Sequence, residues 1–100
     1  MSDDHDVRFR RLLREVLESP GELPPAVRAQ AAAEAPLPEP LASFARKLRA
    51  GAPVHGEDVE ALRRAGYSED AVFELTVAVA LGLAKRRLDE GLRALQEAVA

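Results

Sequence analysis

Apolar side chains recur every three or four positions over most of the chain, which is the period of an α-helix. The first such run ends where Ser19, Pro20 and Gly21 interrupt it, and its apolar members are Phe9, Leu12, Leu13, Val16 and Leu17. Residues 1–6 are acidic and lack the pattern. We therefore expect a disordered N-terminus over residues 1–6, followed by a single helical domain over residues 7–100.

Prolines divide the segment that follows. Pro24 and Pro25 stand where a first helical turn tolerates proline, and the alanine-rich stretch as far as Glu34 favours a second helix. Residues 35–40 are Ala-Pro-Leu-Pro-Glu-Pro. Because this stretch cannot be helical along its length, it predicts an extended and fairly stiff connector.

Two more short helices are predicted before the C-terminal one. The third has apolar spacing from Leu41 to Leu48 and a stop at Gly51, and the fourth spans about residues 57–65, with Val59 facing inward. Apolar and polar residues never alternate as they would in a strand. The pattern predicts an all-α protein of about five helices, the last of them long.

The turn at Gly66 is the most sharply defined local feature. Gly66 suits the left-handed position just past a helix, and Tyr67 would contact Leu62 behind it. Ser68 can cap the next helix, whose first turn contains two acidic residues that favour the positive end of the helix dipole. Tyr67 can also pack on Val72, so we interpret the Gly66–Ser68 turn as structural.

The predicted C-terminal helix is apolar on every side over residues 71–84, apart from Glu74 and Thr76. A helix is about 10 Å across, so surrounding it takes about six packed neighbours. The chain offers four other predicted helices, most of them short. We expect a second copy of the chain to cover the rest and predict a homo-oligomer; packing within one chain is the alternative.

A seam of apolar residues with a seven-residue repeat runs along the predicted C-terminal helix, and after residue 87 the apolar pattern narrows to this seam. Its members are Val77, Leu81, Ala84, Leu88, Gly91, Leu95 and Ala98, widened by Leu92 and Val99. Small residues at alternate positions allow two helices to approach closely. We interpret the seam as the contact between subunits.

Composition narrows the classes of function. The net charge of −3 gives no support for nucleic-acid or anionic-membrane binding, and no apolar run is long enough to span a bilayer. With no cysteine and only two histidines, the chain offers no thiol chemistry and no metal site. The acidic start is unlike a signal peptide, and arginine and alanine are abundant, so we expect a cytoplasmic bacterial protein without a cofactor.

Residues 58–95, DVEALRRAGYSEDAVFELTVAVALGLAKRRLDEGLRAL, resemble the carboxymuconolactone decarboxylase and alkylhydroperoxidase D-like family. In that family a short helix ends in an Ala-Gly turn, passes Ser/Thr and acidic residues, and enters a long Ala/Val-rich helix. The resemblance covers about two-fifths of the chain. It implies the helical bundle of alkylhydroperoxidase D-like proteins.

The peroxidase branch of this family carries C-x-x-C-x-x-x-H before the Ala-Gly turn. Aligning Gly66 with the family glycine puts Gly51 and Val54 at the cysteine positions and Asp58 at the histidine position. Peroxide reduction needs a thiolate, so this activity is excluded. The decarboxylase branch does not depend on cysteine, so a cysteine-independent enzyme of that type stays as the alternative function.

Three residues are candidates for proton transfer: Glu74, His55 and Asp58. Glu74 lies in an apolar helix; it could pair with Arg63, with Arg64 or with an arginine of another chain, or lie on a partly exposed rim. A loop histidine such as His55 is usually only solvated, and Asp58 suits the first turn of a helix. For Glu74 too a structural role is favoured over a catalytic one.

Residues 85–87, Lys-Arg-Arg, could bind an anion, but acidic residues follow at 89 and 90. We expect these cations to be used in pairs within the helix and between subunits. The sequence as a whole predicts a non-catalytic helical protein that self-associates or binds other proteins.

Overall fold

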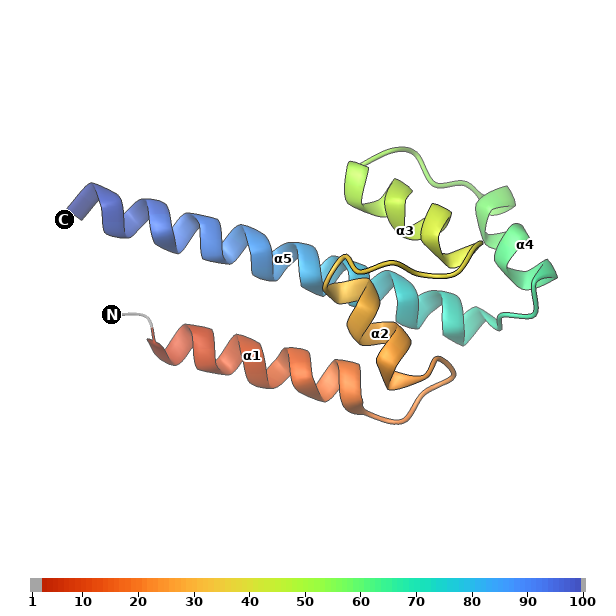
Figure 1. Cartoon of the computed structure of the whole chain (residues 1–100), viewed down its shortest axis with the longest axis horizontal. Coiled ribbons are helices and arrows are strands. Elements are labelled where there is room, and N and C mark those ends of the chain that lie inside the picture. The colour runs from red at the N-terminus through yellow and green to blue at the C-terminus, as the bar shows by residue number, and fades with distance from the viewer. Residues whose placement is uncertain (1–2, 100) are drawn as a thin grey trace.

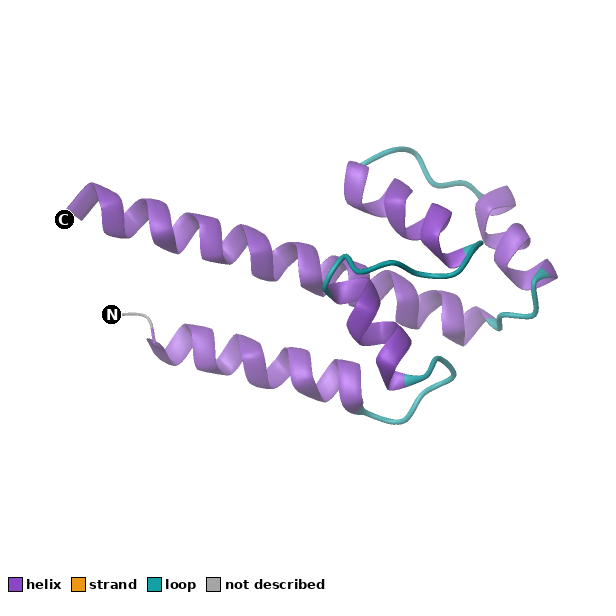
Figure 2. Cartoon of the chain, viewed as in Figure 1, coloured by secondary structure: helices purple, strands orange, loops and turns teal. Residues whose placement is uncertain are grey.

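A computed structural model describes residues 3–99, and the side chains of residues 7–99. All regular structure in this part of the chain is helical, and the all-α prediction with a long C-terminal helix is confirmed (Figures 1 and 2). The five helices are α1 (Asp3–Glu18), α2 (Pro25–Ala32), α3 (Leu41–Ala50), α4 (Gly56–Arg64) and α5 (Glu69–Val99).

Two boundaries differ from the expectation. α1 begins at Asp3, so residues 3–6 are helical where we expected disorder; residues 1 and 2 lie outside the described part. Acidic residues at the start of a helix are favoured by its dipole, which gives a physical reason for the longer helix. α2 ends at Ala32 because Glu34 takes the left-handed conformation, with φ 59°.

α5 is the spine of the molecule (Figure 1). α2 crosses it and makes its most extensive contact, and α3 packs beside it. α1 runs back along the C-terminal half of α5, on the other side from α3 in this view, with the N-terminal end of α1 near the C-terminal end of α5. The remaining helix, α4, lies near the start of α5.

The core gathers around the first half of α5. Leu75 of α5 and Leu62 of α4 are fully buried, at 0% exposure. The other buried apolar residues are Leu23, Ala31, Leu41, Phe44, Ala45, Ala71, Val72, Ala78 and Val79. Since the aromatic contribution is one phenylalanine, close packing depends on small residues that let the helices approach.

The shape is elongated. The radius of gyration is 15.2 Å, where about 13 Å is typical of a compact chain of this length. The extents are 52 × 29 × 20 Å, because the second half of α5 and the first half of α1 extend beyond the core (Figure 1). The two helices form an arm, which leaves apolar surface open to solvent.

The apolar stretch of α5 is covered by the chain on one face only. Ala71, Leu75 and Ala78 lie on the buried face, against the other helices. On the opposite face Phe73 is 68% exposed and Ala80 is exposed as well. The other helices of this chain thus leave that face of α5 without a neighbour.

Candidate functional site

Glu74 is held by backbone amides. Its Oε2 accepts a hydrogen bond from the N–H of Glu22 at 2.8 Å, and its Oε1 accepts one from the N–H of Leu23 at 2.8 Å. These amides belong to the loop between α1 and α2, about fifty positions away in the sequence. A half-buried carboxylate on α5 therefore fixes the loop that reverses the chain after α1.

Gly21 makes this contact geometrically feasible. A Cβ atom at Gly21 would lie 2.7 Å from Oε1 of Glu74, closer than side-chain atoms approach in real structures. Of the two structural roles considered for Glu74, the ion pair with Arg63 or Arg64 does not form within the described residues, and the side chain is partly exposed. Arg63 instead faces Glu60 at 3.3 Å and Glu69 at 3.8 Å. Free loop amides satisfy the carboxylate without a buried second charge.

The hydrogen bonds of Glu74 bear on whether it could act as a general acid or base. A general acid or base needs an oxygen directed at a substrate. In Glu74 both oxygens accept amide hydrogen bonds. The geometry assigns this carboxylate to loop anchoring.

His55 and Asp58 lie at the start of α4, where His55 is exposed and Asp58 is half-buried. His55 is the residue that precedes the helix, and its backbone N–H donates to Oδ2 of Asp58 at 2.9 Å. Nζ of Lys47 donates to Oδ1 of the same carboxylate at 2.6 Å. The Lys47 hydrogen bond, followed by that from the His55 amide, lowers the pKa of Asp58. A carboxylate held ionised in this way joins α3 to α4 and is poorly suited to take up a proton.

The turn between α4 and α5 has the geometry of a Schellman motif. Gly66 has φ 100°, and the N–H of Tyr67 donates to the carbonyl of Leu62 at 3.1 Å. Ser68 Oγ accepts from the N–H of Ala71 at 3.1 Å, which caps α5. Tyr67 packs on the core that contains Leu62 and Val72. The three turn residues set the angle between the helices.

Arg28 is a structural residue that the sequence analysis missed. It is only 3% exposed, and its Nη1 donates to the carbonyl of Val16 at 2.8 Å. Its Nη2 donates to the carbonyl of Ser19. These carbonyls end α1 and have no partner within a helix. The only signal in the sequence is the position of Arg28 three residues before Ala31, on the inward face of α2.

The basic residues 85–87 are paired. Lys85 bonds Asp89 at 2.6 Å and Arg87 bonds Glu90 at 3.2 Å, both within α5, as expected. Arg86 reaches another element and pairs with Glu34, just past the end of α2. This pair ties the α2–α3 connector to the spine.

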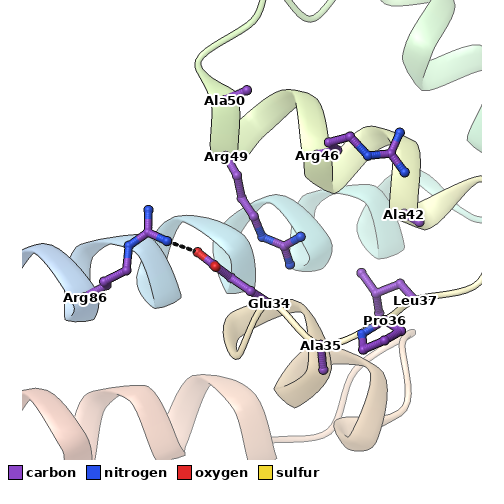
Figure 3. A pocket seen from close by; sticks show the side chains of 9 residues that line it. All are labelled: Glu34, Ala35, Pro36, Leu37, Ala42, Arg46, Arg49, Ala50 and Arg86. Carbon is purple, nitrogen blue, oxygen red and sulfur yellow. Dashed lines mark hydrogen bonds and ion pairs between the residues drawn. The ribbon is translucent and has the colours of Figure 1, made fainter.

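An open hollow lies beside this pair, between the connector, α3 and α5 (Figure 3). Its volume is about 440 Å³. It is lined by three arginines, one glutamate and small or apolar residues: Arg46, Arg49, Arg86, Glu34, Ala35, Pro36, Leu37, Ala42 and Ala50. Arg86, one of the basic residues that the sequence suggested could bind an anion, lines this hollow, whereas the proton-transfer candidates Glu74, His55 and Asp58 do not.

The predicted seam divides into two faces. Leu88 is half-buried and lines an apolar hollow with Phe9 and Leu12 of α1, and Leu81, seven positions earlier, is half-buried on the same side of α5. The exposed members Ala84, Gly91, Leu95 and Ala98 fall, with Phe73, Ala80 and the half-buried Val77, on a face that the helices of this chain leave largely uncovered. We call this face the open stripe; it consists of Phe73, Val77, Ala80, Ala84, Gly91, Leu95 and Ala98.

Within the described residues, His, Asp and Glu side chains never gather in a group of three that could hold a metal ion. No helix in residues 3–99 is both long enough and apolar enough to cross a bilayer. The chain matches no family model, no curated protein and no solved structure.

Proposed function

We propose that the chain is a non-catalytic helical protein that acts by self-association, with the open stripe of α5 as its contact surface. The observation that carries this proposal is the uncovered apolar face of α5, marked by Phe73 at 68% exposure. An exposed phenylalanine on an apolar helix face is typical of a protein contact.

The amount of open surface supports a second copy as the occupant. The chain exposes 6525 Å². A compact monomer of 10.8 kDa exposes about 5,500 Å², so roughly 1,000 Å² more is accessible than expected. A standard protein interface covers about 800 Å² on each partner. The excess is of the same size as the area that one dimer contact removes from each chain.

The composition of the stripe supports close helix packing. Ala80, Ala84 and Gly91 present little side-chain bulk, and a Cβ at Gly91 would meet nothing within 4 Å. Phe73 and Leu95 add larger apolar groups towards the two ends. Small residues let two helices approach, and large ones at the ends provide apolar burial.

Kinship with the carboxymuconolactone decarboxylase and alkylhydroperoxidase D-like family is part of the proposal and rests on residues 58–95. A bacterial cytoplasmic setting rests on composition alone. The alternative, a cysteine-independent decarboxylase-type enzyme, has weaker support. It requires Glu74 to face a substrate, whereas its oxygens bind the amides of Glu22 and Leu23.

The decisive experiment is light scattering of the wild type and of Ala80→Glu over a range of concentrations. Ala80 is exposed in the single chain, so a charge there disturbs the contact without disturbing the core. Leu81 is less suitable for this substitution because it is half-buried within the chain. We expect a wild-type oligomer at micromolar concentration and a monomeric variant, because an unpaired charge would be desolvated. Gln30→Glu adds the same charge on an exposed position of α2 and should remain oligomeric. A wild type that stays monomeric at high concentration contradicts the proposal.

A further inference from the structure

We propose that the hollow between α3, α5 and the α2–α3 connector binds a small organic anion, in which a carboxylate or phosphate group is attached to an apolar body. This site is separate from the open stripe and does not depend on self-association. Its lining combines arginines with apolar side chains in one open volume of about 440 Å³ (Figure 3).

The charges around the hollow sum to a positive value. Arg46 and Arg49 are three positions apart on α3, so they lie on the same face of the helix. Arg86 comes from α5 and is neutralised by Glu34. Arg46 has a single, distant partner in Glu39, at 3.8 Å, and the two side chains are 70% and 61% exposed. Exposed pairs of this kind are weak, so an incoming anion can replace Glu39.

Arg49 is the centre of the proposed site. It is half-buried, and its Nη2 donates to the carbonyl of Ala31 at 2.7 Å. Because a carbonyl is neutral, this hydrogen bond does not compensate the charge of the guanidinium. Among the described residues no carboxylate pairs with Arg49, and its Nε is buried without a hydrogen-bond partner. A half-buried cation without a counter-ion is unfavourable. An anion placed in the hollow against Arg49 would remove that cost.

The rest of the wall fits an apolar body. Pro36, Leu37 and Ala42 line the side of the hollow next to the arginines. The volume falls in the range of about 300–1,000 Å³ that is usual for small-molecule sites. Prolines limit the conformations of the connector, so this wall is formed in advance of binding.

The backbone at Glu34 supports a functional reading of the hollow. Glu34 holds a φ of 59°, which is unfavourable for a residue with a side chain, and glycine is the usual residue at this position after a helix. Unusual conformations of this kind are often found at functional sites. Here the conformation accompanies the pair between the Glu34 carboxylate and Arg86, which leaves Arg46 and Arg49 as the arginines facing a ligand.

The test is an NMR titration at constant ionic strength with phenyl phosphate, benzoate, inorganic phosphate and neutral benzyl alcohol. We expect saturable shifts of the residues around the hollow with phenyl phosphate or benzoate, and comparison of the two identifies the preferred anionic group. Inorganic phosphate should bind more weakly, and benzyl alcohol should not bind. Binding should weaken about tenfold in Arg46→Gln and in Arg49→Gln, because each removes a charge-assisted hydrogen bond.

Arg93→Gln is the matched control, since it removes the same charge from an exposed position of α5 and should leave the affinity unchanged. Arg49 also binds the end of α2, so Arg46→Gln decides the outcome if Arg49→Gln unfolds. Three results would overturn the proposal: no saturable binding up to about 10 mM, equal weakening in Arg93→Gln, or inorganic phosphate binding as tightly as phenyl phosphate.

Discussion

Gly82 and Ala32 meet through their backbones where α2 crosses α5. A Cβ atom at Gly82 would lie 2.0 Å from the carbonyl oxygen of Ala32 and 2.7 Å from its Cα. No side chain can give way at this crossing, because the atoms in contact are backbone. A glycine in the middle of a long helix, which lowers helix propensity, is thus explained by the close approach of α2 to α5 at this point.

We expect Gly82→Ala to destabilise the fold by about 3 kcal/mol or more, since the added methyl group must push α2 away from α5. Thermal and urea unfolding measure the effect. Gly91→Ala is the control, measured at a dilution where the chain is monomeric, because Gly91 is in the same helix and a Cβ there meets nothing within 4 Å of the single chain. That variant should gain about 0.5–1 kcal/mol from helix propensity. Equal stability of the two variants would contradict the close crossing.

Glu74→Gln should destabilise the chain by roughly 2 kcal/mol, since the carboxylate that accepts from the amides of Glu22 and Leu23 is replaced by a neutral group with one acceptor oxygen. Hydrogen exchange of these two amides should become faster in the variant. Glu97→Gln, at an exposed position of α5, is the control and should leave both quantities unchanged. Unchanged exchange in Glu74→Gln would show that the loop is held by other contacts.

The order of the helices could be predicted because its signals are local. The apolar spacing, the prolines before α2 and the turn at Gly66 depend only on residues close together in the sequence. The partner of Glu74 could not be predicted from such signals. Its amides lie about fifty positions away, and any half-buried carboxylate can be satisfied by an arginine or by free backbone groups.

The hollow and the role of Arg28 could not be predicted from the sequence for a related reason. Arg46, Arg49 and Arg86 come together only when α3 is placed against α5. Nothing in the spacing of an arginine distinguishes one that caps a neighbouring helix from one that is solvated. The seam was predicted as one surface. In the structure α1 lies beside Leu88 and partly covers it, whereas Ala84 remains exposed.

The pair between Lys47 and Asp58 predicts a pH dependence of stability. The pKa of Asp58 is lowered in the folded chain from its ordinary value of 3.8, so the ionised carboxylate stabilises the native state. This contribution is fully present above that value and is lost as the pH falls through the lower folded pKa. Urea unfolding should show Asp58→Asn as less stable than the wild type at pH 7, with the difference disappearing at lower pH. A difference that persists in strong acid would exclude this origin.

The left-handed residue after α2 predicts an order of stabilities. Glu34→Ala should be destabilised, because it loses the ion pair with Arg86 and keeps the unfavourable φ of 59°. Glu34→Gly loses the same pair but relieves the backbone, so it should be about 1 kcal/mol more stable than Glu34→Ala. Thermal unfolding of the two variants measures this difference directly. Equal stability would mean that the backbone relaxes around the new residue.

The chain contains no cysteine, so a cysteine introduced on the open stripe is its only thiol and can be cross-linked without side reactions at other positions. In a symmetric dimer, residues near the two-fold axis face their own copies. We therefore expect mild oxidation to produce a covalent dimer in at least one of Ala80→Cys, Ala84→Cys and Gly91→Cys, and the fastest of the three locates the axis. A disulfide requires Cα atoms within about 7 Å, so rapid formation reports close helix packing.

Gln96→Cys is the control for this scan. Gln96 is exposed on α5 but lies well around the helix from the open stripe, so its thiol should face solvent and cross-link only slowly, by random collision. The cross-linking rate of the stripe variants should not depend on dilution until the dimer dissociates. The cross-linking rate of Gln96→Cys should instead decrease with every dilution, because it depends on collisions between separate molecules. If all four variants cross-link slowly and in proportion to concentration, α5 does not pair through the open stripe, and the proposed contact surface is wrong.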